Sequence, residues 1–559
     1  MENIAPFVEF LVANDIEFSE KLEIKYSAAR GYHVLLADSP SKRTTKIRQD
    51  EVLLRVPKGA VLSATSSCIC NLIYDNDKYG DSDEDKIDQQ APPSSELARL
   101  VLAFIVESAL REKSPWYAYL GMMPSQPEFS LRAFGPQSDA DNDRARREDE
   151  EVRSWFKGTD VDDVARAAYE EISELYDTIA VPFYTSNEDV LRPLLSGSAT
   201  DEVRITSKHT FMTAASIVGA RCFDIDAFVG LGLCPVADLF NHAGTERDAD
   251  VRFETAFEVC EMCGMHARCE HDTEINDDES MEQDDDDEED GKVPKLINLV
   301  EDYVMVNASD DDSSDSVSDS GIPLIDTCDI VARHTISSKT RRGREIFNSY
   351  GPLPNAHLLV KYGFAFRGGK ETNAHDYISL ERDLRRIYRE HDLRWSSIHS
   401  DKLAPEIKMN VDGCVSVDLW DRVVELHVRK AVSRAATKAE AAAVVAVVSH
   451  DALRVFNSAP EKLAGSLFSA SSSSEAVRTL RTVVLTILEL IARRWRIFTG
   501  GISSREYDFV IQDEAEAAKL PRHEQVKRFA LIITANEKEI LEHGRRRCER
   551  ALGIEKSMK

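Results

Sequence analysis

The chain has 559 residues and a formal net charge of -30. A chain of this length can form two to four domains and at least one sizeable hydrophobic core. Because proteins that bind nucleic acids normally present a basic face, the acidity argues against direct binding of DNA or RNA. It favours a basic protein partner, and simple solubility is the alternative explanation.

The sequence also lacks the patterns of membrane and secreted proteins. Its longest apolar stretches, at 441–448 and 483–492, are well short of the roughly 20 residues that cross a membrane. The acidic, amphipathic N-terminal segment is unlike a secretory or mitochondrial presequence. Ten cysteines are scattered without the spacing of a disulfide framework. We therefore expect no membrane partner and a location in the cytoplasm, the nucleus or both.

The N-terminal part mixes helical and strand patterns. Apolar residues at helical spacing begin the chain, around Phe7 and Leu11. Two short strands are predicted at 32–36 and 51–57. After an acidic linker, the spacing predicts a helix over 96–112.

The central part is interrupted by charged segments. Residues 137–150 are predicted to form a charged loop, and helical spacing resumes over 151–220. An insertion at about 260–323 is nearly all acidic in places, and we expect it to be disordered because it can bury too little apolar surface. A further strand is predicted at 326–333.

The C-terminal part is helical. Beyond about residue 375, apolar residues recur at helical spacing over 431–456, 474–498 and 521–543. We place a domain boundary near 368–369, where two glycines follow each other.

Two short motifs about a hundred residues apart are the most informative part of the sequence. Ala237–His242 is an apolar run that ends in Asn-His, and Phe347–Gly351 reads Phe-Asn-Ser-Tyr-Gly. Four further segments, named in chain order, add to these two motifs: 114–124, 212–223, 361–364 and 528–541. Together they resemble the SET-domain protein lysine methyltransferases of the Rubisco large-subunit methyltransferase-like class, which includes fungal ribosomal-protein lysine N-methyltransferases.

The resemblance implies an α+β fold in which a β-rich SET domain carries a helical insert and precedes an all-α substrate-binding domain. The expected domains are an N-terminal helix with the first SET strands, the helical insert, the SET core with its acidic insertion, and the helical C-terminal domain. Their expected bounds are 1–95, 96–220, 221–368 and 375–559.

The resemblance also implies an activity. It predicts an S-adenosylmethionine-dependent protein-lysine N-methyltransferase of the EC 2.1.1 class, acting on a basic protein. A large-subunit ribosomal protein is the expected substrate, and a histone is the alternative. Two other functions stay open: methylation of histidine on the same fold, and a non-catalytic SET scaffold that binds basic proteins.

Site residues follow from the same resemblance. Tyr350 is the expected catalytic residue, which would orient the incoming amine beside the methyl group. The residues expected to bind the cofactor are Arg30, Gly31, Arg221, Asn241, His242, Tyr350 and Phe364.

Each of these residues also has a purely structural interpretation. Tyr350 could be a strand-end tyrosine packed on the core, Arg221 a surface arginine and Phe364 a core aromatic. Asp238 could hold the first motif in place through hydrogen bonds. The segment Arg30–His33 departs from the Gly-x-Gly usual in the family.

A separate cluster of cysteine and histidine follows the first motif. Cys260, Cys263, Cys269 and His271 offer thiolate and imidazole groups at a spacing that suits tetrahedral zinc. The usual second pair of ligands well downstream is missing, so a cysteine-rich loop without metal is the alternative. We expect no metal in the catalytic site and leave zinc binding at this cluster open.

Overall fold

The computed structural model of the chain describes residues 4–27, 30–37, 45–74, 93–127, 129–136, 143–194, 205–244, 248–256, 259–265, 269, 271, 326–337, 344–367, 373–391, 393, 395, 406–467, 474–498, 517 and 519–554. Both motifs lie within these residues. The acidic stretch at 272–325, where disorder is expected, and the expected boundary at 368–369 lie outside them.

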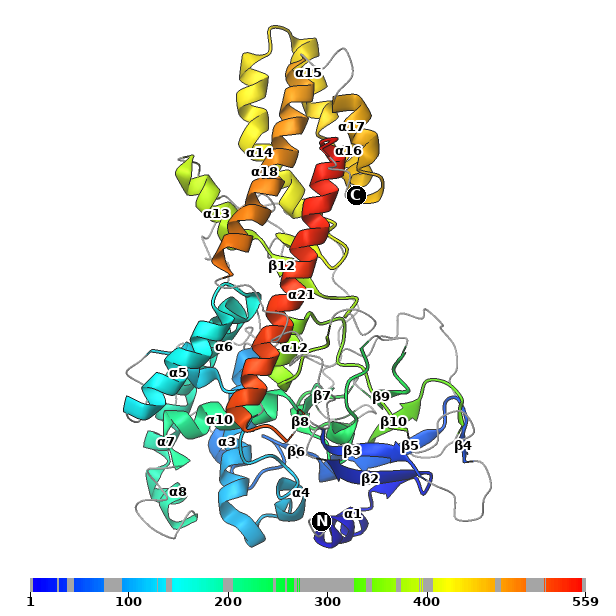
Figure 1. Cartoon of the computed structure of the whole chain (residues 1–559). Helices are drawn as coiled ribbons and strands as arrows, with labels where there is room; N and C mark the ends of the chain where they lie inside the picture. Colours follow the sequence, from blue (N-terminus) through cyan, green and yellow to red (C-terminus); the bar gives the residue numbers. More distant parts are fainter. Residues whose placement is uncertain are drawn as a thin grey trace, which may run out of the picture. The chain divides into compact units, whose positions relative to one another are not determined.

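The chain divides into two compact units. Unit 1 comprises Met1–Gly135 and Ala167–Gly351, and unit 2 comprises Pro136–Arg166 and Pro352–Lys559. Both motifs fall within unit 1. Figure 1 labels the elements of both units.

Unit 1 contains small antiparallel sheets. The largest has the strand order β1-β5-β10-β9, and a second has the order β6-β8-β7. The remaining strands form two pairs, β2-β3 and β11-β4. The strands are β1 (Glu17–Phe18), β2 (Leu22–Ser27), β3 (Gly31–Leu36), β4 (Lys46–Ile47), β5 (Val52–Pro57), β6 (Leu62–Ser63), β7 (Cys222–Asp226), β8 (Gly230–Leu233), β9 (Val251–Thr255), β10 (Thr327–Ala332) and β11 (Ile336–Ser337).

The predicted strands at 32–36, 51–57 and 326–333 are confirmed as β3, β5 and β10. β10 lies centrally, with Ile330 opposite Leu54 of β5 and opposite Phe253 of β9. All three side chains are buried, which fixes the register because a one-residue slip would turn them to the other face. Small antiparallel sheets combined with many helices confirm the α+β class.

One long helix, α3 (Pro93–Leu110), lies in the core of unit 1. Helix α3 packs against α10 and against strands β6 and β8, and the side chains at 98 and 100–106 are buried. The prediction of a helix at 96–112 is thus confirmed, although the α-helical part ends at Leu110. Its buried Glu107 accepts hydrogen bonds from the Ser67 hydroxyl and the Cys68 amide. The unit contains α1 (Ala5–Ala13), α2 (Cys70–Ile73), α3 (Pro93–Leu110), α4 (Tyr117–Leu120), α7 (Val181–Ser186), α8 (Glu188–Leu194) and α10 (Lys208–Gly219), and the boundary between the units falls within α6 (Asp160–Leu175).

Unit 2 is built mainly of helices around its own core. Helices α14 and α21 both pack against α18, and the buried Trp420 donates its indole N–H to the Val448 carbonyl at 3.0 Å. The elements of this unit are α5 (Asp143–Phe156), α12 (Asn355–Tyr362), α13 (Glu381–Glu390), α14 (Val417–Arg434), α15 (Lys438–Val447), α16 (His450–Ser458), α17 (Glu461–Leu467), α18 (Glu475–Ile497), α21 (Arg522–Ala551), β12 (Tyr377–Ser379) and β13 (Lys408–Asn410).

One expectation about the loops is wrong, and one predicted helical stretch is subdivided. The predicted charged loop at 137–150 is helical from Asp143, because α5 packs against α21 and i,i+4 ion pairs such as Arg144–Glu148 support it. The helical spacing predicted over 431–456 is confirmed, and the structure divides it among three helices, α14, α15 and α16. Thr437 caps the N-terminus of α15, because its hydroxyl accepts a hydrogen bond from the Glu440 amide.

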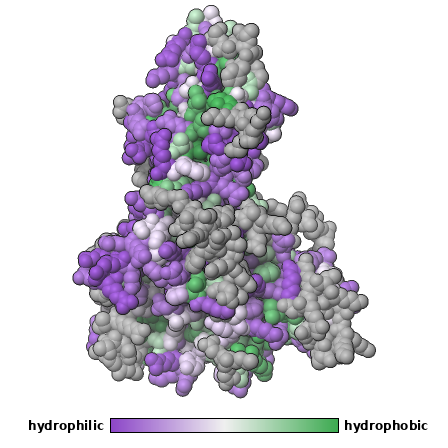
Figure 2. Space-filling model, viewed as in Figure 1, coloured by the Kyte–Doolittle hydropathy of each residue, from purple (hydrophilic) through white to green (hydrophobic). Residues whose placement is uncertain are grey.

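Hydrophilic residues cover most of the described surface on the face shown in Figure 2, as the high charge content leads one to expect. No helix among the described residues is both long and apolar enough to span a membrane.

A buried arginine links several parts of unit 2. The Arg494 guanidinium on α18 forms an ion pair with Asp160 and lies 3.7 Å from an Asp383 oxygen and 4.0 Å from a Glu537 oxygen. Glu537 also accepts the Asp160 amide at 2.7 Å. Burial raises the pKa of Asp160 to about 6, against the opposing effect of the Arg494 charge. The guanidinium is therefore the charge that makes burial of three carboxyl groups tolerable.

Replacing Arg494 by methionine should destabilise unit 2 by about 3–5 kcal/mol, because it leaves buried carboxylates without their counter-charge. Chemical unfolding followed by tryptophan fluorescence would measure the change. Arg493→Met is the matched control: this neighbour pairs with Glu390 and Glu489 at the surface and should lose only about 0–1 kcal/mol. Equal losses in the two variants would contradict the role given to Arg494.

Candidate active site

The two motifs form one hydrogen-bonded structure in unit 1. The Asn348 amide donates to the Asn241 carbonyl at 2.8 Å, and the Ala243 amide donates to the Asn348 carbonyl at 2.8 Å. His242 and Asn348 thus form a parallel bridge. The pairing holds the two motifs side by side at their polar residues, Asn241 and His242 in the first and Asn348 in the second.

Tyr350 is held at both its backbone and its side chain. Its hydroxyl donates to the Phe240 carbonyl at 3.1 Å, and its amide donates to His242 Nδ1 at 3.0 Å. The Tyr350 and His242 rings stack with centroids 5.0 Å apart. Burial raises the pKa of the Tyr350 phenol above its ordinary value, although the positive charge of Arg221 opposes the shift. The phenol therefore remains protonated at neutral pH.

His242 has a structural role that the sequence did not predict. A backbone amide can only donate, so Nδ1 of His242 must accept, and the proton of the neutral ring is on Nε2. The parallel bridge uses the Asn241 carbonyl and the Ala243 amide. The backbone N–H and C=O of His242 therefore point away from Asn348.

The buried Asp238 and the partly exposed Arg221 form an ion pair beside this structure. Arg221 follows α10, and Asp238 lies in the short 3₁₀ helix η7 (Ala237–Leu239). Arg221 Nη1 lies 3.3 Å from an Asp238 carboxylate oxygen and 3.4 Å from the Asp238 carbonyl. Burial raises the pKa of Asp238 to about 6, while the Arg221 charge acts to lower it. Asp238 therefore does hold the motif in place, as one interpretation of the sequence proposed.

Several polar atoms of and around this pair lack a well-formed hydrogen bond among the described residues. Among the described residues, Arg221 Nε and Nη2 donate no hydrogen bond. Asp238 Oδ1 and the hydroxyl of the buried Tyr119 interact with each other, but they form no hydrogen bond of good geometry. Because the Arg221 side chain is 26% exposed, another molecule could reach its remaining donors and form hydrogen bonds with them.

Glu345 joins two of the predicted cofactor residues. Its carboxylate accepts the Asn241 side-chain amide at 2.6 Å and forms an ion pair with Arg30, whose side chain is 45% exposed. The Glu345 side chain is almost completely buried. The sequence patterns did not single out Glu345. Its position next to Ile346 and Phe347, where the second motif begins, is the signal that could have indicated it.

Asp250 is a second residue that sequence analysis missed. Its buried carboxylate accepts the Phe347 amide at 3.1 Å and lies 3.4 Å from Arg344 and 3.2 Å from His334. Its own amide donates to the Phe347 carbonyl at 2.7 Å. It therefore fixes the strand that leads to Tyr350.

Two glycines beside the site have positive φ angles. Gly31 begins β3 with φ 63°, and Gly351 follows Tyr350 with φ 95°. A Cβ atom added at Gly351 would meet nothing within 4 Å. Glycine is thus required there for its backbone conformation and not for space, which agrees with the turn expected after Tyr350.

The structure brings together most of the predicted site residues. Tyr350 contacts His242, Glu345 links Asn241 with Arg30, and the Arg221 charge acts on Tyr350. Gly31 adjoins Arg30 at the start of β3, whereas Ala29 lies outside the described residues.

Phe364 lies in unit 2, where its ring packs edge to face on Phe366 at 5.7 Å and lies 6.4 Å from the Tyr362 ring. Phe364 thus belongs to unit 2, and its expected contact with the cofactor stays a prediction.

Gly351→Ala should destabilise unit 1 by roughly 1–2 kcal/mol, because alanine at φ 95° is strained. Gly59→Ala is the matched control, since a Cβ atom there also meets nothing within 4 Å but the residue does not have a positive φ. Thermal unfolding of both variants would measure the difference. A loss at Gly59 as large as at Gly351 would show that backbone conformation is not the cause.

The raised pKa of Asp238 predicts a pH dependence. The folded-state value of about 6 lies above the ordinary 3.8, so the folded protein holds a proton that the unfolded chain releases between these values. The contribution to stability is present at low pH and is lost as the pH rises through 6. Between pH 7 and pH 5 the wild type should therefore gain about 1 kcal/mol relative to Asp238→Asn.

Melting temperatures measured from pH 5 to pH 7 would test this difference, with the exposed Asp15→Asn as the control that keeps the wild-type slope. Parallel pH profiles for the wild type and Asp238→Asn would contradict the assigned shift.

Two known fungal proteins are similar to this chain in sequence. The chain is 27% identical over 382 residues to ribosomal lysine N-methyltransferase 3 of Saccharomyces cerevisiae, covering 63% of this chain and 62% of that protein. It is 24% identical over 243 residues to an uncharacterized protein of Schizosaccharomyces pombe, covering 42% of each. The chain thus spans less than two thirds of the length of these relatives. No family model matches the chain.

Solved structures give matches that extend over most of the chain. One is the SET domain of LSMT bound to lysine and AdoHcy, with a TM-score of 0.47 and 13% identity, covering 98% of this chain and 90% of that chain. Another is Rubisco LSMT bound to AdoMet, with a TM-score of 0.48 and 12% identity, covering 99% of this chain and 94% of that chain. The resemblance predicted from the motifs is confirmed by the yeast relative: this chain is similar to the SET-domain lysine methyltransferases.

Proposed function

We propose that this chain transfers a methyl group from S-adenosylmethionine to a lysine side chain of a protein. The observation that carries the proposal is the pairing of the two motifs, which holds Tyr350 between the Phe240 carbonyl and His242. The similarity to a yeast ribosomal lysine N-methyltransferase supports the same reaction.

The arrangement of Tyr350 suits the positioning of an amine. When bound, S-adenosylmethionine supplies a methyl group on a sulfonium, which a neutral amine can take up in one displacement that leaves S-adenosylhomocysteine. The Tyr350 hydroxyl donates its proton to Phe240, so its oxygen keeps lone pairs that can accept a hydrogen bond from the incoming amine. Holding the methyl donor and the amine together in a near-attack geometry can lower a barrier by roughly 7–11 kcal/mol, of which Tyr350 would supply a part.

The amine must first lose its proton. Deprotonating a lysine with a pKa of about 10.4 near pH 7 costs on the order of 4 kcal/mol. A partly desolvated position disfavours the ammonium and so lowers this cost. Tyr350 is half-buried and its phenol is protonated, so it adds no negative charge that would hold the ammonium form.

The donor groups of unit 1 fit the proposed cofactor. Arg221 has Nε and Nη2 available for the cofactor carboxylate, a planar group that a guanidinium binds well. The backbone N–H and C=O of His242 point away from the bridge and suit recognition of the adenine or the amino group. Gly31 and Arg30 would add contacts at the start of β3.

For the substrate we propose a basic protein, with a large-subunit ribosomal protein first and a histone second. The net charge of -30 favours a basic partner, and the yeast relative is named for ribosomal lysine. Neither direct nucleic-acid binding nor a membrane partner is part of the proposal, and the location proposed is the cytoplasm, the nucleus or both.

The proposal predicts that the purified chain binds S-adenosylmethionine and that Arg221→Ala weakens this binding, because the cofactor carboxylate loses its partner. Tyr350→Phe should lower methylation of ribosomal proteins on the order of 10²-fold, since the amine is no longer oriented. Calorimetry would measure binding, and transfer of labelled methyl groups to ribosomal proteins would measure activity.

Matched controls are available within unit 1. Arg252→Ala removes an arginine that pairs with Asp50 and Glu254, and Tyr117→Phe changes an exposed tyrosine. Both should keep wild-type binding and activity. A folded wild type that binds no cofactor would overturn the proposal, and mass spectrometry of the product would reveal histidine methylation in place of lysine methylation.

A further inference from the structure

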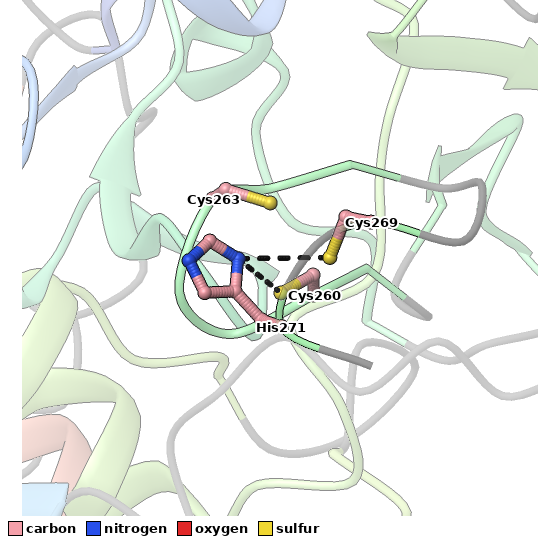
Figure 3. Close-up of side chains that lie close together, drawn as sticks. All are labelled: Cys260, Cys263, Cys269 and His271. Carbon is pink, nitrogen blue, oxygen red and sulfur yellow. Dashed lines mark hydrogen bonds between the residues drawn. The ribbon is translucent and has the colours of Figure 1, made fainter. Parts of the chain in front are cut away.

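A cluster of three cysteines and one histidine lies in unit 1 at the start of the long connection between β9 and β10. The side chains of Cys260, Cys263, Cys269 and His271 point toward one another (Figure 3), and one possible ligand atom from each lies within 4.8 Å of all the others. None of these residues takes part in the candidate active site described above.

The two nitrogen–sulfur distances of His271 match the edges of a tetrahedral zinc site. His271 Nδ1 lies 3.7 Å from Cys260 Sγ and 3.6 Å from Cys269 Sγ. Zinc–sulfur bonds of about 2.3 Å and zinc–nitrogen bonds of about 2.0–2.1 Å at tetrahedral angles place sulfur and nitrogen about 3.6 Å apart. Nδ1 has either one proton or one lone pair, so it cannot form full hydrogen bonds to both sulfurs at once. A shared metal ion explains both contacts.

A tight turn brings the first two cysteines together. The Gly264 amide donates to the Cys260 carbonyl at 2.7 Å, and the Cys260 amide donates to the Met265 carbonyl at 3.0 Å. Gly264 has φ 72°, a conformation that favours glycine. A Cβ atom at Gly264 would lie 2.8 Å from the Phe228 ring, so the turn is also seated closely against the connection between β7 and β8.

The connection that carries the cluster is anchored at both ends. The buried ammonium of Lys58 bonds to the Ala256 carbonyl at 3.0 Å and forms ion pairs with Asp226 and Asp326. Ala256 directly follows β9 and Asp326 directly precedes β10. The cluster thus lies close in sequence to a rigid part of unit 1.

The segment that carries the cluster has little hydrophobic core of its own. Met262 and Met265 are 71% and 53% exposed. Metal binding can replace a core in such short segments, because ligation holds together residues that apolar contacts do not.

We propose that Cys260, Cys263, Cys269 and His271 bind one Zn²⁺ ion as a structural site. Three thiolates and a neutral imidazole complete a tetrahedron without an open position, which is typical of structural and not of catalytic zinc. Soft sulfur ligands favour zinc over magnesium or calcium. The ion would hold the first part of the β9–β10 connection in one compact conformation.

The test is the metal content of the full chain, purified without chelators and measured by inductively coupled plasma mass spectrometry. The wild type should contain about one zinc per chain. Cys263→Ser and Cys269→Ser should contain at least about ten-fold less. Cys70→Ser is the matched control, since Cys70 is a half-buried free cysteine of unit 1 outside the cluster, and it should keep the wild-type content.

Substitution of the wild type with Co²⁺ tests the ligands without relying on folded variants. The proposal expects intense visible absorption typical of tetrahedral cobalt with thiolate ligands. A thiol assay in denaturant should then find all ten cysteines reduced. A folded wild type without zinc and without these cobalt bands would overturn the proposal, and so would a disulfide within the cluster.

Discussion

The pairing of the backbone at Asn241–Ala243 with the backbone at Phe347–Tyr350 is the constraint on which the candidate site depends. It sets the Phe240 carbonyl opposite the Tyr350 hydroxyl and brings His242 under the Tyr350 ring. The long chain between the motifs costs little extra, because the entropy of closing a loop grows only with the logarithm of its length, by about 0.6 kcal/mol for each doubling. A long insertion between β9 and β10 is therefore compatible with an intact site.

Buried charges serve each unit differently. In unit 2, Arg494 joins carboxylates from α6, α13 and α21 to α18, although Arg494 Nε, Asp383 Oδ2 and Glu537 Oε2 form no hydrogen bond among the described residues. In unit 1, the pair of Arg221 and Asp238 leaves several polar atoms unsatisfied near Tyr350. A pair that is only partly satisfied costs stability, and the proposed cofactor would supply the missing partners.

The insertion after β9 has two chemically distinct parts. The first part, up to His271, contains three cysteines and a histidine that converge, and it is seated on the β7–β8 connection through Gly264. The second part, 272–325, is strongly acidic and lies outside the described residues. Zinc ligation would allow the chain to change from a packed strand to an acidic segment without extending the hydrophobic core.

The sequence by itself determined the features that depend on neighbouring residues. Alternating apolar residues predicted β3, β5 and β10, helical spacing predicted α3, α18 and α21, and the two motifs predicted the resemblance to SET-domain methyltransferases. Asn241, His242 and Tyr350 could be named from these motifs, because motif residues are consecutive in the chain, whereas Arg30, Gly31 and Arg221 were named through the resemblance alone.

Only the tertiary structure decided the features that depend on distant contacts. The charged segment α5 is a helix because it packs against α21, more than three hundred residues later in the chain. Glu345 and Asp250 are site residues because folding brings their carboxylates to Asn241 and to the Phe347 amide. The convergence of the cysteine and histidine ligands likewise became visible in three dimensions, because spacing alone leaves open whether side chains point toward one another. Local patterns report which face of an element is apolar, whereas the partner of a buried charge is set by the fold.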